Sequence, residues 1–285
     1  MEEMTTETHV EAPLSEVDTW GATFAAAGVS RRGTTLAIHD DACRVVRVAS
    51  ITKLVTAWAT LLAVEEGATT LRTPLGPEGS TVRHLLSHAG GYAFDSPTVL
   101  ARPGTRRIYS NTGYELLAQH VATVTGIPFE DYVAEGVLEP LGMTASELRG
   151  SAAKDLWSHV TDLLTFAREM SDPALLHPDT VSDARTPQFP DLDGVLPGWG
   201  AQRPCWWGLG PELRGDKSPH WSGSTASPDT FGHFGGTGTF LWVDPACDVA
   251  CVALSDREFG PWSVTAWPPF SDAVRAWANG RDPVS

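Results

Sequence analysis

Ser50 and Lys53, in the run Ser50-Ile51-Thr52-Lys53, are the residues whose types and spacing most clearly suggest chemistry. A short β-branched run, Val45–Val48, precedes them, and apolar residues recur at helical spacing from Leu54 to Glu66. We therefore expect Ser50 to open a helix, where residues three apart share a face and the serine hydroxyl can meet the lysine amine. The pair predicts a serine nucleophile whose base is an amine.

The use of lysine at position 53 supports this interpretation, because the chain rarely uses lysine. Of its twenty Lys and Arg residues, only Lys53, Lys154 and Lys217 are lysines. A helix N-terminus and burial both disfavour the ammonium form, which would leave a free amine that accepts the serine proton. A second Ser-x-x-Lys run, Ser151–Lys154, follows a turn-like segment, and we interpret it as the roughly one chance match expected in a chain of this length.

A second proton-handling group is expected in the run Tyr109-Ser110-Asn111, which precedes a helical pattern over Gly113–Thr125. In an extended loop, side chains two apart point the same way. Tyr109 could then carry a proton to a leaving group, while Asn111 orients a substrate carbonyl or Lys53. The alternative is that Tyr109 is an ordinary half-buried loop tyrosine.

The glycine-rich run His233–Gly238 leads directly into the predicted strand Thr239–Val243. Glycines in a strand mark the close approach of another backbone or of a ligand, and a substrate along that edge would meet main-chain N–H groups. His233 lies two residues before Gly235 and would share its face. The similar run at His88 ends a helix-like segment, so we interpret His88 as a structural histidine.

These three elements, in this order, resemble the serine hydrolases related to class C β-lactamases and D-alanyl-D-alanine carboxypeptidases, the penicillin-binding-protein-like family. The likeness extends to the segments Val82–His88, Tyr109–Leu117 and Val137–Met143. It covers the chain from about Thr34 to Arg257.

The resemblance implies a role for each motif residue. Ser50 would be the acylated nucleophile, and Lys53 and Tyr109 the pair that transfers protons. Asn111 would be a polar orienting group, and His233 stands where many relatives carry lysine. The N–H groups of Ser50 and Gly236 would form the oxyanion hole, with Gly235 and Gly236 on the substrate-binding strand.

Two departures from the family pattern concern the substrate. Phe234 stands where many relatives have a hydroxyl residue that helps to bind a substrate carboxylate. His233 has an ordinary pKa of ~6.5 and would be mostly neutral at cytoplasmic pH. We expect turnover to change as His233 gains its proton, between about pH 5.5 and 7.5, which is about one unit either side of that pKa. Both departures favour an ester, thioester or amide substrate that lacks a carboxylate there.

We therefore expect a serine acyl hydrolase that acts on an ester or amide bond through an acyl-enzyme on Ser50, an esterase-like member of the β-lactamase-related family. A D-alanyl-D-alanine carboxypeptidase or a β-lactamase is the alternative within the enzyme class. A weakly turning-over, penicillin-binding-like sensor or binding protein is the alternative of another class. An α/β-hydrolase is disfavoured because the sequence has no Gly-x-Ser-x-Gly elbow.

Four tryptophans flank the glycine-rich run, namely Trp206, Trp207, Trp221 and Trp242. They could form an aromatic wall around an acyl or leaving group, or they could pack in the core of a sheet. The sequence leaves both interpretations open.

Strand-like runs near both chain ends, with mainly helical segments between them, predict an α/β (α+β) fold. We expect an antiparallel sheet built from both chain ends with packed helices, plus a mainly helical inserted lobe, the β-lactamase/transpeptidase-like arrangement that the resemblance also implies. The predicted division is residues 1–60 and 195–285 for the α/β lobe and 61–194 for the helical lobe, with the site at the seam. Local predictions are a helix over Ser15–Ala27, a hairpin of Thr34–Ile38 with Cys43–Val48, strands over Trp206–Leu213, Thr239–Val243 and Asp248–Leu254, and a helix over Ser271–Asn279.

Composition narrows the partners and the location. A formal charge of -15 and a pI near 4.9 disfavour nucleic acid and anionic membrane surfaces, so a small-molecule substrate is expected. No apolar stretch reaches transmembrane length, and the acidic start Met1–Glu7 does not read as a secretory signal, which predicts a cytoplasmic protein. The four cysteines and nine histidines lack disulfide or metal-ligand spacing, so we expect no cofactor and no metal.

Overall fold

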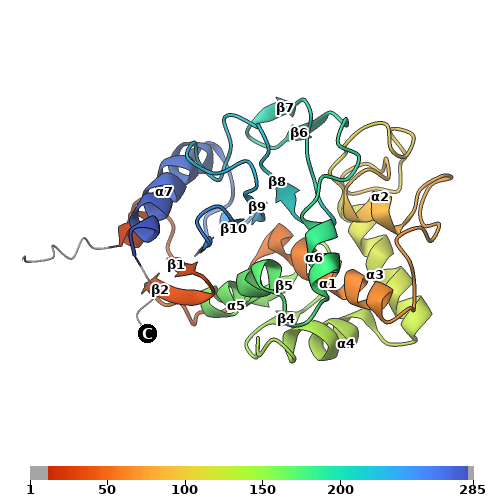
Figure 1. Ribbon diagram of the computed structural model, residues 1–285, viewed down its shortest axis with the longest axis horizontal. Coiled ribbons are helices and arrows are strands. Elements are labelled where there is room, and N and C mark those ends of the chain that lie inside the picture. Colours follow the sequence, from red (N-terminus) through yellow and green to blue (C-terminus); the bar gives the residue numbers. More distant parts are fainter. Residues whose placement is uncertain (1–11, 282–285) are drawn as a thin grey trace, which may run out of the picture.

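The computed structural model describes residues 12–281, and both ends of this segment contribute strands to one six-stranded antiparallel sheet (Figure 1). The strand order is β2-β1-β11-β10-β9-β8, so strands near the two ends of the chain are neighbours. The strands are β1 (Ala25–Arg31), β2 (Thr34–His39), β8 (Glu212–Leu213), β9 (Phe231–Gly235), β10 (Thr239–Asp244) and β11 (Val249–Ser255). The prediction of an antiparallel sheet built from both chain ends is confirmed.

Helices cover both faces of this sheet. Helix α7 (Pro261–Asn279) and the 3-10 helix Pro13–Trp20 lie on one face, and α5 (Val160–Ser171) packs on β1, β10 and β11 from the other. Every residue of β10 and β11 is buried, and successive residues alternate between two hydrophobic clusters. This two-sided burial explains why these strands read as continuous apolar runs. Residues 160–171 thus pack on the sheet, although the predicted division assigns them to the helical lobe.

The remaining helices gather beyond the sheet, around the largely buried α1 (Figure 1). They are α1 (Thr52–Glu65), α2 (Val82–Leu86), α3 (Asn111–Thr125), α4 (Phe129–Val133), a π-helical turn (Ala134–Leu138) and α6 (Pro178–Ala184). Two small sheets complete the structure: β3 (Val46–Arg47) with β5 (Leu156–Ser158) and β4 (Glu147–Leu148), and the pair β6 (Gly194–Leu196) and β7 (Gly200–Gln202). Helix α1 packs against α3 and α4, which places its N-terminus between the sheet and the helices.

The predicted helix over Ser15–Ala27 is wrong in its second half. The 3-10 helix ends at Trp20, Gly21 adopts a left-handed φ of 67°, and Ala25–Ala27 begin strand β1. Alanine favours helices locally, but these small side chains pair with β11 and pack under helices on both faces. Tertiary pairing overrides the local preference.

The predicted hairpin is also wrong, because β2 pairs with β1 and not with the segment Cys43–Val48. The β1–β2 turn uses positive φ values at Arg32 (49°) and Gly33 (72°), which suit the twist of a two-residue hairpin. From the segment Cys43–Val48, only Val46–Arg47 form a strand, and they pair with β5. This pairing joins residues far apart in the sequence, which a local pattern does not reveal.

Two further boundaries differ from the predictions. The predicted strand Trp206–Leu213 is reduced to β8, and the C-terminal helix begins at Pro261, well before Ser271. Pro268 and Pro269 lie inside this helix, which continues through them because Trp267 and Phe270 are buried against the sheet. Cys251 lies on β11, whereas Cys247 precedes it in a turn; these two cysteines, Cys43 and Cys205 are free thiols.

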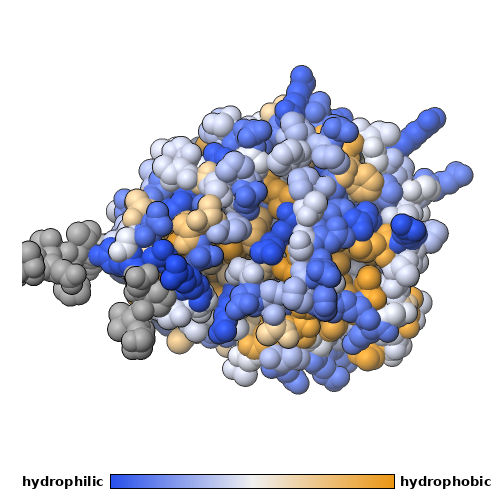
Figure 2. Space-filling view, viewed as in Figure 1, coloured by the Kyte–Doolittle hydropathy of each residue, from blue (hydrophilic) through white to orange (hydrophobic). Residues whose placement is uncertain are grey.

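Hydrophilic residues cover much of the face shown in Figure 2, and apolar residues gather near its middle and toward the α3–α4 side. Between residues 12 and 281, no helix is both long and apolar enough to cross a membrane. The segment Met1–Glu7 lies outside the described residues, and the cytoplasmic location stays a prediction.

Candidate active site

Ser50 lies in a 3-10 turn, Ala49–Ile51, that leads directly into α1. The residue before it, Ala49, has a positive φ of 47°, a conformation that costs a non-glycine residue about 1–2 kcal/mol. Two threonine hydroxyls hold this turn: Thr52 donates to the Ala49 carbonyl at 2.5 Å, and Thr239 donates to the Val48 carbonyl at 2.9 Å. The α-helix itself begins at Thr52, so the half-buried Ser50 lies in the 3-10 turn just before it and does not open the helix as predicted.

Lys53 is completely buried, and its amine reaches Ser50 as the three-residue spacing predicts. Its Nζ lies 3.2 Å from Ser50 Oγ, 2.6 Å from Asn111 Oδ1 and 2.8 Å from the Ala153 carbonyl. Burial lowers the pKa of Lys53 from 10.5 to about 7. A neutral Lys53 amine can give its two N–H groups to Asn111 and Ala153, which leaves its lone pair for the Ser50 O–H.

The carboxylates near Lys53 act on its charge from a distance. Asp95 and Glu115 raise the pKa of Lys53 and partly oppose the effect of burial, while Lys154 lowers it further. Lys217, the other buried lysine, differs because its Nζ donates directly to a buried carboxylate, Glu212 Oε1, at 2.6 Å. A directly bonded carboxylate, as at Lys217, favours an ammonium. The partners of Lys53 are neutral oxygens, which accept hydrogen bonds from a neutral amine as well.

The second Ser-x-x-Lys run supports the Lys53 site instead of forming a nucleophile of its own. The Ala153 carbonyl accepts from Lys53, and the Ala152 carbonyl accepts from Thr56 Oγ1 at 2.6 Å. The Ser151 hydroxyl donates to Glu115. Sequence reasoning missed Ala153, because a backbone carbonyl can come from any residue and leaves no signal.

Asn111 is the first residue of α3, whose N-cap is Ser110. Its Oδ1 accepts from Lys53, and its Nδ2 donates to Asp95 Oδ1 at 2.8 Å. The predicted orienting role of Asn111 toward Lys53 therefore has a structural basis. Asp95 was not predicted, and the only sequence signal was its place in the loop after the paired glycines.

Tyr109 lies among aromatic rings beside Lys53. The Tyr109 ring centroid is 4.5 Å from that of His88, 5.8 Å from that of Trp207 and 5.8 Å from that of Phe94, and Lys53 Nζ is 4.7 Å from the Tyr109 centroid. Burial raises the pKa of the Tyr109 phenol, and its hydrogen bond with Ser50 opposes that shift. The phenol is therefore protonated at neutral pH, so Lys53 fits the role of base and Tyr109 that of proton donor.

His233 faces Tyr109 as an uncharged ring. Its Nδ1 lies 2.6 Å from the Phe234 carbonyl, which can only accept, so Nδ1 carries the hydrogen. Nε2 then has a lone pair 3.4 Å from the Tyr109 hydroxyl. Burial lowers the pKa of His233 to about 3, and the charge of Lys53 adds to this. The titration expected for His233 between pH 5.5 and 7.5 is therefore wrong, because the ring is too deeply buried to gain a proton there.

The two glycines after His233 have different roles. A Cβ at Gly235 would lie 2.4 Å from both the Val48 carbonyl and Thr239 Oγ1, so glycine lets β9 lie against the backbone just before Ser50. A Cβ at Gly236 would meet no atom within 4 Å, and this residue is exposed. The predicted close approach is thus made by the chain itself at Gly235, and open space remains at Gly236. The oxyanion hole of the Ser50 and Gly236 N–H groups stays a prediction.

The four tryptophans divide between the two interpretations. Trp207 packs against Tyr109 and His233, whereas Trp221 and Trp242 are buried in the cluster under α7. Trp206 packs at the margin of the other cluster. The aromatic surroundings of the site therefore come from Trp207 and from Phe94, a residue that the sequence reasoning missed.

Phe234 points away from Tyr109, because neighbouring residues of a strand face opposite sides of the sheet. It packs among four rings on the α7 face: Trp199, Trp221, Phe259 and Trp267. Position 234 therefore supplies no hydroxyl group to the site around Ser50.

The loop that carries Tyr109 is fixed by two buried residues. The Ser110 N–H donates to His88 Nδ1 at 3.2 Å, and the His88 ring meets the Trp207 ring edge-on at 4.6 Å. Arg107 donates to the carbonyls of Ser87 at 2.5 Å, Gln188 at 2.6 Å and Cys205 at 3.0 Å. The His88 contacts fit a structural role, although its Nε2 is buried without a hydrogen-bond partner among the described residues. Arg107 ties the Tyr109 loop to Gln188 and Cys205, in the segment before β8.

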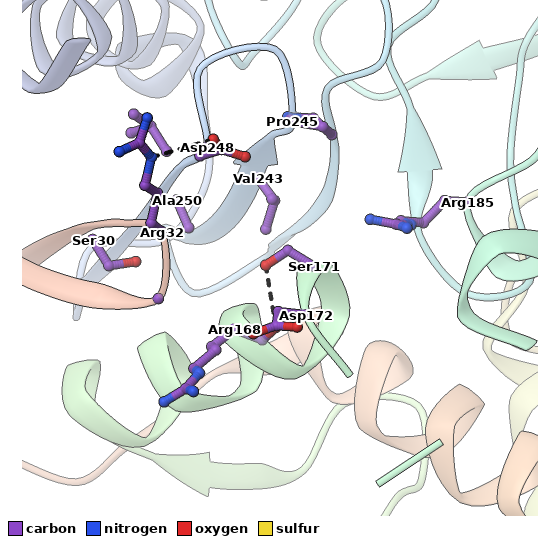
Figure 3. Close-up of a pocket in the computed structure, with 12 residues that line it drawn as sticks. Ser30, Arg32, Arg168, Ser171, Asp172, Arg185, Val243, Pro245, Asp248 and Ala250 are labelled. Carbon is purple, nitrogen blue, oxygen red and sulfur yellow. Dashed lines mark hydrogen bonds and ion pairs between the residues drawn. The ribbon is translucent and has the colours of Figure 1, made fainter. Parts of the chain in front are cut away.

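A cavity of about 270 Å³ lies elsewhere, between the β1–β2 turn, the β10–β11 turn and the end of α5 (Figure 3). Its charged residues are mixed in sign: Asp248 pairs with Arg32, Arg168 and Asp172 come from α5 and the residue after it, and Arg185 lies apart from both aspartates. None of the predicted site residues lines it. In the part of the chain that the structure describes, no group of three or more His, Cys, Asp and Glu side chains could hold a metal ion.

Comparisons with known proteins identify the family and the fold. A family model described as Beta-lactamase matches residues 18–275. The chain is similar to a beta-lactamase from Mycobacterium bovis of known crystal structure, with 49% identity, a TM-score of 0.92 and coverage of 94% of this chain and 99% of that one. EstCE1, described as a hydrolase with promiscuous acyltransferase activity, has the same fold at 16% identity, with a TM-score of 0.77 and coverage of 92% and 96%. The predicted β-lactamase-like fold is confirmed.

A curated relative is the Escherichia coli K12 protein named "Putative D-alanyl-D-alanine carboxypeptidase". It is 29% identical over 208 residues, which cover 56% of this chain and 47% of that protein. The chain therefore spans about half the length of the curated relatives it matches.

Proposed function

Because this chain belongs to the beta-lactamase family of serine hydrolases, we propose that it cleaves an ester or amide bond through an acyl-enzyme on Ser50. The observation that carries the proposal is the buried Lys53 amine 3.2 Å from the Ser50 hydroxyl, with a pKa lowered to about 7. About half of the Lys53 side chains are then neutral at pH 7 and can accept the serine proton.

The reaction follows from these positions. The neutral Lys53 amine takes the proton of Ser50 as Oγ bonds to the substrate carbonyl carbon. Tyr109 gives its proton to the leaving oxygen or nitrogen as that bond breaks, and the Lys53 ammonium then returns a proton to the phenolate. Water then attacks the carbonyl carbon of the acyl-enzyme and gives one proton to the neutral Lys53 amine. Lys53 returns this proton to Ser50 Oγ as the carboxylic acid product leaves. Each proton transfer by a positioned side chain contributes a factor of about 10²–10⁴.

Two features favour a substrate without a carboxylate near β9. His233 is uncharged, because burial lowers its pKa to about 3, so it offers no cation at this position. Phe234 supplies no hydroxyl and packs on the other face of the sheet. These features support an esterase-like member of the family over one that clamps an anionic substrate.

The second candidate function is β-lactam hydrolysis or carboxypeptidase action. It is favoured by the 49% identity to the Mycobacterium bovis beta-lactamase and by the name of the Escherichia coli relatives. A slowly turning-over binding protein would share the same acylation step and differ only in deacylation.

A fluorophosphonate probe followed by peptide mass mapping tests the nucleophile. We expect an adduct on Ser50 that is lost in Ser50→Ala, greatly slowed in Lys53→Ala and kept in the matched control Ser151→Ala. An adduct elsewhere, or equal labelling in Lys53→Ala, would contradict the proposal.

A substrate panel then separates the candidate functions. It contains p-nitrophenyl esters of rising chain length, nitrocefin and a D-alanyl-D-alanine peptide. We expect the esters to turn over fastest. Preference for nitrocefin or the peptide would favour the second candidate, and a Ser50 acyl group that does not clear would favour the binding protein.

A further inference from the structure

We propose that Asp95 is a positioning residue for Ser50 acylation, whose carboxylate orients the Asn111 amide so that the amide oxygen faces the Lys53 amine. The inference rests on the proposed role of Lys53 as the base. It assigns a function to an exposed loop residue outside the predicted site.

Three hydrogen bonds attach the Asp95 loop to the first turn of α3. Asp95 Oδ1 accepts from Asn111 Nδ2 at 2.8 Å, the Phe94 carbonyl accepts from the Asn111 N–H at 2.7 Å, and the Ala93 carbonyl accepts from the Ser110 hydroxyl at 2.7 Å. Asp95 is exposed and so contributes little to the core, whereas Asn111 is 5% exposed. The buried Asn111 amide beside the base therefore donates its hydrogen bond to a solvent-facing carboxylate.

The orientation follows from hydrogen-bond chemistry alone. An ionised carboxylate only accepts, so the NH2 end of Asn111 must face Asp95 and the oxygen must face Lys53. If the amide were reversed, its N–H would be directed at Lys53 and would use the amine lone pair that Ser50 needs. The orientation of Asn111 therefore decides whether the base is available to the nucleophile.

Asp95 also acts on Lys53 through its charge. The other charged groups around Lys53 are Glu115 on α3, which acts in the same sense as Asp95, and Lys154, which acts in the opposite sense. His88 and His233 face the same region as neutral rings, because burial lowers the pKa of both. Removal of Asp95 should thus have two separable effects, one on the titration of Lys53 and one on the orientation of Asn111.

The variants Asp95→Asn and Glu115→Gln separate the two effects. Both remove a negative charge, so both should lower the midpoint of the acid limb of kcat/KM, by up to about one pH unit. Only Asp95→Asn lets the Asn111 amide reverse, so only this variant should lower the plateau at high pH, by about tenfold or more. An Asp95→Asn plateau within twofold of the wild type would overturn the proposal.

A double-mutant cycle tests whether Asp95 acts through Asn111. In an Asn111→Ala background, Asp95→Asn should lower the plateau no further, while its shift of the acid midpoint should remain. A merely structural role of Asp95 would instead give additive losses, and additivity would contradict the proposal.

Magnetic resonance supplies a readout that does not depend on activity. The chain contains only two asparagines, Asn111 and Asn279, and three lysines, so selective ¹⁵N-Asn and ¹³C-Lys labelling gives few signals. Asp95→Asn adds one further labelled NH2 pair, which is recognised because Glu115→Gln and the wild type lack it. We expect the Asn111 NH2 pair to shift in Asp95→Asn and to stay in place in Glu115→Gln, with the Lys53 midpoint lowered in both. An unmoved Asn111 pair would overturn the inference. Failure of Ser50 to react with the probe would instead overturn the proposed function.

Discussion

The Lys53 amine lies 3.2 Å from the Ser50 hydroxyl, and the Lys53 side chain is completely buried. Neither of its other two partners is a carboxylate, since they are the Asn111 amide oxygen and the Ala153 carbonyl. Burial without a directly paired anion destabilises the ammonium form, which is the physical origin of the lowered pKa.

The first prediction concerns the pH dependence of acylation. With the pKa of Lys53 near 7, the neutral amine makes up about one tenth of the population at pH 6 and about nine tenths at pH 8. The rate of probe labelling and kcat/KM should therefore rise with pH through a midpoint near 7. In Lys154→Met the midpoint should move up, because Lys154 lowers the pKa of Lys53. A flat profile from pH 6 to 8 would rule out Lys53 as the base.

The second prediction concerns stability. The folded state holds Lys53 with a pKa of about 7, against 10.5 for an exposed lysine, so between these values the unfolded chain binds more protons. Stability from this group therefore rises with pH across that window. Relative to Lys53→Met, the wild type should gain about 1.4 kcal/mol of unfolding free energy per pH unit from about pH 7 to 10. Urea unfolding at several pH values measures the difference, and parallel curves would contradict the assignment.

The third prediction separates the Tyr109 hydroxyl from its ring. Tyr109→Phe keeps the contacts with His88, Phe94 and Trp207 but removes the proton donor, so kcat should fall by about 10²–10⁴ with little change in melting temperature. Tyr114→Phe is the matched control. Its hydroxyl donates to the Leu86 carbonyl at 2.9 Å, so this variant should lose about 1–3 kcal/mol of stability and keep its activity. The reverse pattern would exclude a catalytic role for the Tyr109 hydroxyl.

The fourth prediction compares the two glycines after His233. Gly235→Ala would force β9 away from the Val48 carbonyl, so we expect a loss of about 1–3 kcal/mol of stability and slower Ser50 labelling. The Cβ of Gly236→Ala meets open space, so the free energy of unfolding of this variant should stay within about 0.5 kcal/mol of the wild-type value. If the edge of β9 binds substrate, Gly236→Ala should raise the KM for esters, and most for the bulkiest esters. Equal stability of both variants would show that β9 does not press on the Ser50 turn.

The local parts of the fold were accessible from the sequence where periodicity and packing agree. Helix α1 and strands β10 and β11 carry long apolar patterns and form as predicted, apart from small shifts of their boundaries. The alanine run at Ala25–Ala27 was misassigned because its local preference is helical, while its neighbours in β11 make it a strand. Pairing across more than two hundred residues leaves no mark on a local pattern.

The sequence by itself determined the chemistry that could occur: a serine, a lysine three residues on, a tyrosine before a helix and a glycine-rich strand. The short spacing of Ser50, in the 3-10 turn, and Lys53, in the first turn of α1, fixes their geometry because the two residues lie on adjacent backbone. The tertiary structure decided the rest. It buried Lys53 and His233 deeply enough to lower the pKa of both, placed the Ala153 carbonyl beside the Lys53 amine, and placed Asp95 beside the Asn111 amide. Desolvation and the direction of a hydrogen bond depend on which surfaces pack together, and only the folded chain sets them.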